Sequence, residues 1–333
     1  MSAVRLCGLC SLVSTAVGGG SCDRRAARFT AFTLVLACLP GNAESRLGLW
    51  NAAASELQIG RAATPITPTE KTGGVKRVLD ELRAKALVLR KDDTTAAIVV
   101  LDLPVVSHAV VEAIRQRVED RTAIPAGNVM ISATHTHTAL TPGWAGSSSF
   151  PALVPPKEGP EVEEAQRYGE LLTESATAAV VRAHKDLQPA RVSAAVGRED
   201  SLPFNRRFLM KDGTVVFNPG IRNANIVRPV GPADPSVPVV LFESAGGAPL
   251  ATLVNYAMHL DTVGEDAYSA DYPHVLGRCL ADVKGPDMLT IFSIGTAGNI
   301  NHVDVAGPRL QRGVGEAARI GIVLAGEVLR TYK

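Results

Sequence analysis

Two histidines separated by one residue stand in the run Ser132-Ala133-Thr134-His135-Thr136-His137-Thr138. The residues just before this run, 128–131, are largely apolar and predict a buried strand. In an extended chain alternate side chains point to the same face, so His135 and His137 are expected to face one cavity. Imidazole nitrogens are common zinc ligands, so this strand end is a candidate metal site. The alternative is a pair of hydrogen-bonded loop histidines.

Polar residues follow three other predicted strands in the same way. In an open α/β sheet, ligand-facing residues gather at the carboxyl ends of the strands. A catalytic zinc takes about three protein ligands and leaves one position for water, so two distant histidines and a carboxylate would suffice. The polar groups in question are Asp102 after strand 96–101, His259 and Asp261 after strand 250–258, and Asn299, Asn301, His302 and Asp304 after strand 288–294.

The elements that must position these residues alternate between strands and helices. Apolar or alternating segments bounded by turn residues predict the strands, and i, i+3, i+4 apolar spacing predicts the helices. The fold class is therefore α/β, with a mixed β-sheet core flanked by helices. The loop 139–160, rich in Pro, Gly and Ser, is a candidate lid or an ordinary surface excursion. Strands are expected at 57–68, 85–89, 96–101, 128–131, 191–197, 237–243, 250–258 and 288–294, and helices from Ser107 through Val118 and at 161–185, 271–283 and 313–332.

Length and composition exclude some classes of function. The chain has 333 residues, 46% of them hydrophobic, which is enough for one large domain with its own core. Its 34 Lys and Arg nearly balance 33 Asp and Glu. Because the net charge is only +1, no basic field is available for nucleic acid, and a nucleic-acid partner is not expected. The sequence does not indicate an oligomeric state.

The N-terminus has the three parts of a secretory signal peptide. Arg24, Arg25 and Arg28 precede an apolar run at 29–39, and small residues follow up to Ala43. We therefore predict a signal peptide at 1–43, a single domain at 44–333, and a secreted or periplasmic protein. The alternative is lipid attachment at Cys38. Four of the five cysteines lie in this leader, and only Cys279 remains in the predicted mature chain.

Several motifs together resemble the N-terminal catalytic domain of the neutral/alkaline non-lysosomal ceramidase family. The resemblance extends from about Leu57 to the end of the chain. It implies a ceramidase-like α/β domain and a zinc-dependent amidase that splits ceramide into sphingosine and a fatty acid. It also implies zinc-ligand roles for His135 and His259, an active-site role for His137, and a place for Arg206 along the substrate. The matching residues are Ile59-Gly60-Arg61-Ala62 with Ile66-Thr67-Pro68, Ser132 to His137, Asn205-Arg206, His259, Ser269-Ala270-Asp271 and Gly298-Asn299-Ile300.

One position departs from the family pattern. Family members carry a serine nucleophile in a Gly-Asn/Asp-x-Ser-Pro-Asn context, whereas this chain reads Gly298-Asn299-Ile300-Asn301-His302. Asn301 thus occupies the place of the serine, and an amide cannot replace an alkoxide. The family's two other zinc ligands, a glutamate and a tyrosine, lie beyond the matched region.

These observations predict an exported, metal-dependent hydrolase that cleaves an amide, or alternatively an ester, of a lipid or other small molecule. One Zn²⁺ would be held by His135 and His259 together with Asp271, Asp261 or His137, and a zinc-activated water would be the nucleophile. A carboxylate that does not bind the metal, or else His302, would be the general base. Arg206 or Asn299 would stabilise the oxyanion. Peripheral membrane contact is also expected. The alternative is a non-catalytic lipid- or glycan-binding domain.

Overall fold

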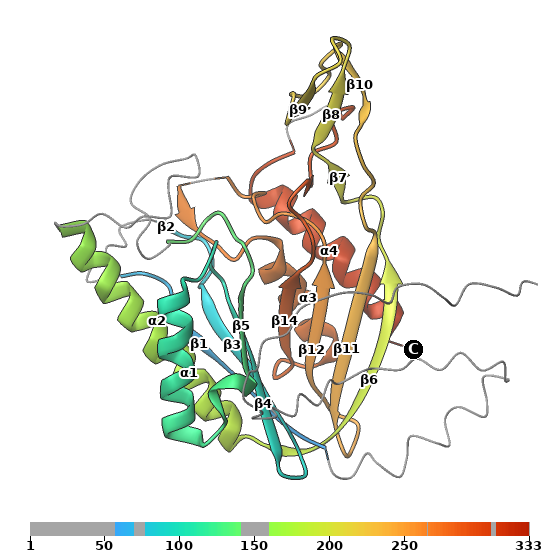
Figure 1. Ribbon diagram of the computed structural model, residues 1–333. Helices are drawn as coiled ribbons and strands as arrows, with labels where there is room; N and C mark the ends of the chain where they lie inside the picture. Colours follow the sequence, from blue (N-terminus) through green and yellow to red (C-terminus); the bar gives the residue numbers. More distant parts are fainter. Residues whose placement is uncertain (1–56, 70–76, 141–159, 265, 308–310, 333) are drawn as a thin grey trace, which may run out of the picture. The chain divides into compact units, whose positions relative to one another are not determined.

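An eight-stranded mixed sheet forms the centre of the protein, in the order β14-β12-β11-β6-β1-β3-β4-β5 (Figure 1). The pairs β4–β5 and β12–β14 are parallel, and the other neighbours are antiparallel. The predicted α/β class and mixed sheet are therefore confirmed. The strands are β1 (Gln58–Pro65), β3 (Arg83–Lys91), β4 (Thr94–Leu101), β5 (Val129–Ala133), β6 (Gln188–Arg198), β11 (Ser236–Ser244), β12 (Pro249–Tyr256) and β14 (Leu289–Ile294).

The computed structural model describes residues 57–69, 77–140, 160–264, 266–307 and 311–332. All of them belong to one structural unit, residues 46–333. The predicted signal peptide at 1–43, the lipid-attachment alternative at Cys38 and most of the candidate lid at 139–160 lie outside the described residues, so these stay predictions. No helix in the described ranges has the length and apolar character needed to cross a membrane.

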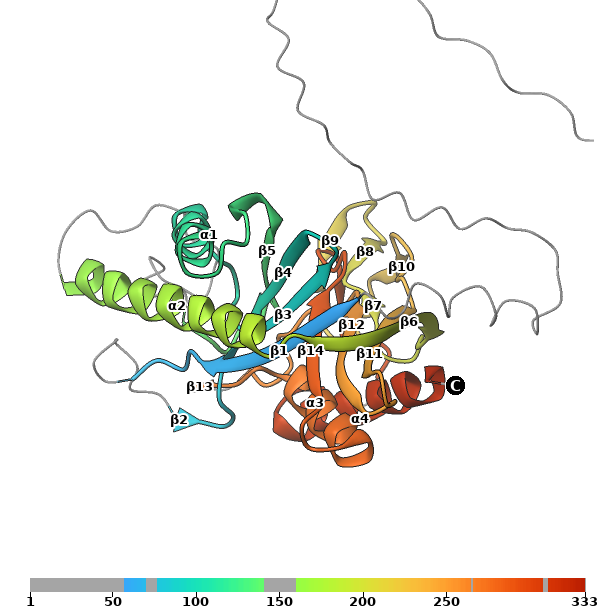
Figure 2. The ribbon, with the colours of Figure 1, turned by 90° about the horizontal axis from the view of Figure 1, so that it is seen from below.

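Helices cover the sheet in two pairs. The helices α1 (His108–Thr122) and α2 (Pro160–Lys185) pack together, and α2 lies on β1 and β3. The helices α3 (Tyr272–Lys284) and α4 (Val314–Thr331) pack together against the other half of the sheet, with α3 on β14 and α4 on β6 (Figure 2). Each helix begins and ends within a few residues of its predicted bounds.

The sheet curves so that its two ends approach each other. The edge strand β14 lies against β4 and β5 at the opposite end of the strand order. Inward-facing side chains of both halves, including Leu87, Val100, Phe242 and Ile291, form one buried cluster. Both parallel pairs are joined by a helical crossover, α1 in one and α3 in the other, which is the usual connection between parallel strands. The carboxyl ends of the two parallel pairs are thereby brought together.

Several short strands were not predicted. The segment β8 (Arg207–Met210) lies between β9 (Val215–Phe217) and β10 (Ile226–Pro229) in a separate three-stranded sheet. The two-residue strand β7 (Phe204–Asn205) pairs with β15 (Ile300–Asn301), and β2 (Arg77–Val78) pairs with β13 (Ala267–Tyr268). None of these strands exceeds four residues, too few to show a period. The β7–β15 pairing matters for function because it places Arg206 beside residues 298–301.

Candidate metal centre

Three histidines from two distant parts of the chain converge where the parallel strands end. One ligand atom each of His135, His137 and His259 lies within 4.8 Å of the other two. Their ring centroids are separated by 5.0 Å for His135–His137, 4.9 Å for His135–His259 and 5.5 Å for His137–His259. Ligand nitrogens of a tetrahedral zinc lie about 3.3 Å apart, given Zn–N bonds of about 2.0–2.1 Å. Side-chain adjustments of about an ångström bring the cluster to that geometry, so it could hold a metal ion.

Backbone hydrogen bonds fix the segment that carries His135 and His137. The amide of His135 donates to the Leu103 carbonyl after β4, and that of His137 donates to the Leu260 carbonyl after β12. The backbone of His135 has φ of 70°, in the left-handed region, so the segment is not a continuous extended strand. His135 and His137 therefore do not come together through the alternation of an extended strand. They come together because hydrogen bonds hold their segment between the ends of β4 and β12.

Carbonyl groups set the tautomers of two of the rings. Nδ1 of His135 lies 2.7 Å from the Pro104 oxygen, and Nδ1 of His259 lies 2.7 Å from the Ala297 oxygen and 3.1 Å from that of Ile300. Because a carbonyl only accepts, each Nδ1 carries the hydrogen, and each Nε2 keeps its lone pair. This is the arrangement that protein metal sites use to orient their histidines. The donor set therefore fits a metal ion.

Two of the three imidazoles, those of His259 and His137, have a lowered pKa. Burial, with the nearby Arg206 charge, lowers the pKa of His259 to about 4. The side chain of His137 is exposed, but partial desolvation still lowers its pKa, against the opposing charge of Asp261. Only a neutral imidazole has a lone pair to donate, so both rings are in the binding form at neutral pH.

Arg206 reaches the cluster from the β7–β15 side. Its Nη2 lies 3.0 Å from Nε2 of His259 and donates to the Gly298 carbonyl at 2.9 Å. Its guanidinium lies over the Phe217 ring at 4.3 Å. A lone pair serves one partner at a time, so a metal ion at His259 takes the place of the hydrogen bond from Arg206. Arg206 is thus in direct contact with the histidine cluster.

The Ser269-Ala270-Asp271 motif holds the histidine segment in place. The hydroxyls of Thr136 and Thr138 each donate to the Ser269 carbonyl at 2.8 Å. Asp80, which sequence analysis did not select, accepts from the Ser269 hydroxyl at 2.5 Å and from the Ala270 amide at 2.7 Å. No short-range pattern around Asp80 indicated this role, because its partners are about 190 residues away in the chain.

Asp271 is a helix cap in the structure, not a member of the metal cluster. Its carboxylate accepts hydrogen bonds from the amides of Thr262 at 2.9 Å, Val263 at 3.1 Å and Tyr272 at 2.7 Å. Burial raises its pKa, and the three amide donors oppose that rise. Because its oxygens are committed to the N-terminus of α3 and the adjacent loop, the predicted ligand role does not fit this geometry.

Replacing Asp271 by alanine is expected to lower the free energy of unfolding by about 3 kcal/mol or more, since three buried amides lose their acceptor. Asp271→Asn keeps one acceptor oxygen and should cost less. Urea unfolding followed by circular dichroism measures both. A loss below about 1 kcal/mol for the alanine variant would contradict the capping role.

Asp261 lies beside the cluster and pairs with His302. Nδ1 of the buried His302 lies 3.2 Å from Oδ1 of Asp261, and its Nε2 lies 2.7 Å from the Gln311 carbonyl. Burial raises the pKa of Asp261, but contact with His302 outweighs it and brings the pKa to about 2. Burial lowers the pKa of His302, but Asp261 and Gln311 outweigh it, and the net shift is upward. Acceptors thus face both ring nitrogens, and this geometry does not fit the predicted role of His302 as general base.

This pair gives the protein a pH-dependent increment of stability. Since the pKa of folded His302 is above the usual value of about 6.5, the increment is complete below that pH and is lost as pH rises through the folded pKa. NMR titration of His302 should give a pKa above 6.5, and Asp261→Asn should lower it. A His302 pKa below 6.5 in the unaltered protein would contradict the ion pair.

Asp102 does not join the cluster. It is buried at the end of β4, where Nζ of Lys85 lies 3.4 Å from its Oδ2 and the Arg83 amide donates to the same oxygen. Burial raises its pKa and the Lys85 charge opposes that effect. The expectation of a ligand-facing Asp102 was therefore wrong, since the carboxylate binds its neighbours on β3.

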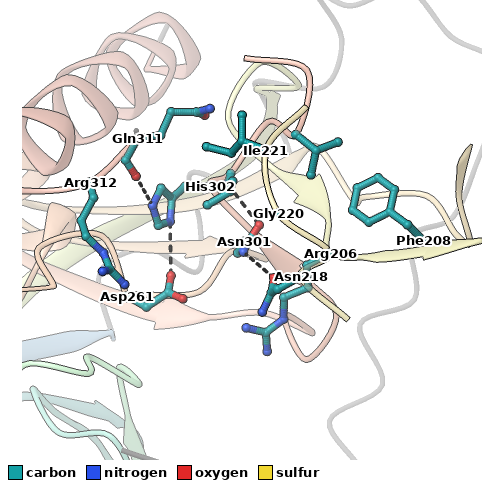
Figure 3. A pocket seen from close by; sticks show the side chains of 12 residues that line it. Arg206, Phe208, Asn218, Gly220, Ile221, Asp261, Asn301, His302, Gln311 and Arg312 are labelled. Atoms are coloured by element: carbon teal, nitrogen blue, oxygen red, sulfur yellow. Dashed lines mark hydrogen bonds and ion pairs between the residues drawn. The ribbon is translucent and has the colours of Figure 1, made fainter. Parts of the chain in front are cut away.

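A pocket of about 510 Å³ adjoins the histidine cluster (Figure 3). Arg206 and Asp261, which lie beside the cluster, also line this pocket. Asn301, which the sequence resemblance matched to the family's serine, lines the pocket. Its amide donates to Asn218 Oδ1 at 3.3 Å, and its oxygen accepts from the Val303 amide at 3.1 Å. The half-buried Asn299 contributes its backbone carbonyl, which accepts from the Arg206 amide at 2.9 Å. The described contacts of Asn299 thus involve its backbone and not the predicted side-chain oxyanion contact.

The sequence matches no family model and no curated protein. Among solved structures, the neutral ceramidase of Pseudomonas aeruginosa superposes with a TM-score of 0.64 at 16% identity. The fold is ceramidase-like. A second structure, a ceramidase complexed with C2, gives a TM-score of 0.65 at 16% identity. In both cases the alignment covers 83% of this chain but 44% of the solved one, so this chain corresponds to less than half of either enzyme.

Proposed function

We propose that this protein is a metal-dependent hydrolase that cleaves an amide or ester bond, with the ion held by His135, His137 and His259. The convergence of three histidine ligand atoms within 4.8 Å of one another, beside a pocket, carries the proposal. The ceramidase-like fold supports it, and the names of those enzymes make a lipid amide the first substrate class to test. Zinc is the ion we favour, since three histidines with an open position are typical of its catalytic sites.

A metal ion held by His135, His137 and His259 would supply a Lewis acid for the scissile carbonyl and would lower the pKa of a bound water to about 7. The residues of the chain supply orientation and charge. Arg206 offers guanidinium N–H groups beside His259, where they can stabilise the negative charge that develops on the carbonyl oxygen. The carbonyls behind His135 and His259 keep both rings in the metal-binding tautomer.

Water is the nucleophile that we propose. No serine, threonine, cysteine or lysine occurs among the described residues that line the pocket. Asn301 cannot attack a carbonyl, and both ends of its amide are engaged by hydrogen bonds. Since the pocket lining offers no hydroxyl, thiol or amine nucleophile, we propose direct attack of water on the carbonyl carbon, without a covalent acyl-enzyme.

Turnover of N-acyl amides and matched esters, with short and long acyl chains, tests this function. We expect hydrolysis that stops after chelation, returns on addition of Zn²⁺, and is absent in His259→Ala. Hydrolysis that survives complete chelation would exclude a metal-dependent reaction. A burst of product followed by a slower phase would point to a covalent intermediate and contradict the direct attack of water.

A second candidate is a non-catalytic domain that binds a lipid or glycan. The loss of the family serine at Asn301 favours it, because the pocket remains while that nucleophile is gone. A binding domain of this kind would retain affinity for substrate analogues while every amide and ester stays intact with or without metal. The turnover experiment above separates the two candidates.

Export is a further part of the proposal and rests on the leader sequence alone. A charged segment, an apolar run and small residues up to Ala43 support cleavage there. N-terminal sequencing of protein recovered outside the cytoplasm should begin at Glu44. Recovery of lipid-modified protein starting at Cys38 would favour the alternative. Contact with a membrane surface stays a prediction.

A further inference from the structure

The pocket beside the histidine cluster carries more positive than negative charge. Its lining includes two arginines, Arg206 and Arg312, and a single acid, Asp261. Asp261 also lies 3.2 Å from Nδ1 of His302. The guanidinium groups of the lining therefore outnumber its carboxylates by two to one.

Neither arginine is committed to a carboxylate of its own. In the part of the chain that the structure describes, no acidic side chain forms an ion pair with Arg206 or Arg312, and Nε of Arg206 is buried without a hydrogen-bond partner. A buried donor without a partner is costly, so such a group commonly marks a place where a ligand supplies the acceptor.

The local backbone makes room for Arg312. Gly264 has φ of 62°, and a Cβ placed on it would lie 2.6 Å from Nε of Arg312 and 2.8 Å from its Cδ. Any other residue at position 264 would push the arginine side chain away. Figure 3 shows the Arg312 guanidinium beside the Asp261 carboxylate and the Arg206 guanidinium on the other side of that carboxylate.

The other end of the pocket is apolar. Phe208 and Ile221 lie there in Figure 3, and Val303 and Val305 also contribute to the lining. A ligand that fills both ends must therefore combine an anionic group with a hydrocarbon portion. Two guanidinium groups favour a planar anion that can accept paired hydrogen bonds, and a carboxylate has that form.

We propose that this pocket binds an apolar carboxylate, with the anion at Arg206 and Arg312 and the hydrocarbon along Phe208, Ile221 and Val305. If the protein is the proposed hydrolase, the same site sets its substrate class. The amide that it cleaves then carries a carboxylate, as an N-acyl amino acid does. Hydrolysis breaks the C–N bond of that amide. Water gives its oxygen to the acyl carbon and a proton to the nitrogen, so that a carboxylic acid and an amine leave.

Calorimetric titration with octanoate and 1-octanol, of equal chain length, tests the anion site. We expect octanoate to bind at least about 10-fold more tightly than 1-octanol, since a hydrogen bond to a charged group corresponds to roughly 10- to 100-fold in affinity. Arg312→Gln should bring octanoate to the level of the alcohol, and Arg312→Lys should restore part of the difference. Arg191→Gln, at an exposed arginine on β6, is the matched control and should change nothing.

Equal affinity for octanoate and 1-octanol, or unchanged octanoate binding in a folded Arg312→Gln variant, would overturn the proposal. Both chelated and Zn²⁺-loaded protein should be titrated, which separates this inference from the hydrolase. Octanoate binding at Arg312 without any hydrolysis would support the anion site while the hydrolase fails. Hydrolysis of neutral amides without octanoate binding would refute the anion site alone.

Discussion

Removing the His259 imidazole is expected to weaken Zn²⁺ binding by more than about 100-fold. Mutation of a residue that only hydrogen-bonds to a metal ligand typically lowers metal affinity by about 10–100-fold. His259→Ala removes one of the three proposed ligands themselves, so its effect should be larger. His135→Ala should have a comparable effect, because the Pro104 carbonyl presets that ring in the same way. Isothermal titration of metal into chelated protein gives the affinities directly.

The matched control is His108→Ala. This histidine is exposed in the first turn of α1, and no contact among the described residues links it to the cluster. Saturating metal at about 100 times Kd should add about 2.7 kcal/mol to the stability of the unaltered protein and of this control, and much less to the cluster variants. Equal metal affinity in His259→Ala and His108→Ala would show that the ion binds elsewhere.

Gly60→Ala is expected to cost about 3 kcal/mol of folding stability, the upper part of the range for overpacking. A Cβ at this position would lie 1.8 Å from the Ala183 carbonyl oxygen and 2.9 Å from the Leu187 amide nitrogen. Both contacts are with backbone, so no side-chain rotation relieves them, and β1 would have to separate from the end of α2. The glycine of the Ile59-Gly60-Arg61-Ala62 motif is thus explained by packing.

Gly169→Ala is the matched control and should have the opposite sign. Gly169 lies within α2, and nothing is within 4 Å of a Cβ placed there. Alanine favours a helix interior by about 0.5–1 kcal/mol over glycine, so this variant should be slightly more stable. Chemical unfolding of both variants measures the difference. A Gly60→Ala protein as stable as Gly169→Ala would contradict the close approach of β1 and α2.

The strands and helices that carry the histidines could be predicted because their signals are local. The apolar run of β4, the cap at Ser107 and the stripe of α1 occur within 30 residues and define one crossover. The Ser107 hydroxyl accepts from the Val110 amide, as a capping residue should. The ceramidase-like fold was predicted from spaced motifs and is confirmed by the structural likeness.

The partners of the polar residues could not be predicted, because they are set by distant contacts. Asp271 was predicted to be a metal ligand, but its hydrogen bonds with the amides of Thr262 and Val263 give it a structural role. His302 looked like a base in sequence, but Asp261 and Gln311 face its two nitrogens. Neither pairing has a periodicity or spacing that sequence alone would show.

X-ray absorption spectroscopy at the zinc edge tests the central claim most directly. For protein loaded with one equivalent of Zn²⁺, we predict about three imidazole nitrogens at roughly 2.0–2.1 Å, with the outer-ring scattering that identifies histidine. His259→Ala should remove one of these contributions. A first shell without histidine, or a spectrum that is identical in His135→Ala, His137→Ala and His259→Ala proteins, would contradict a metal centre at the meeting point of the two parallel strand pairs.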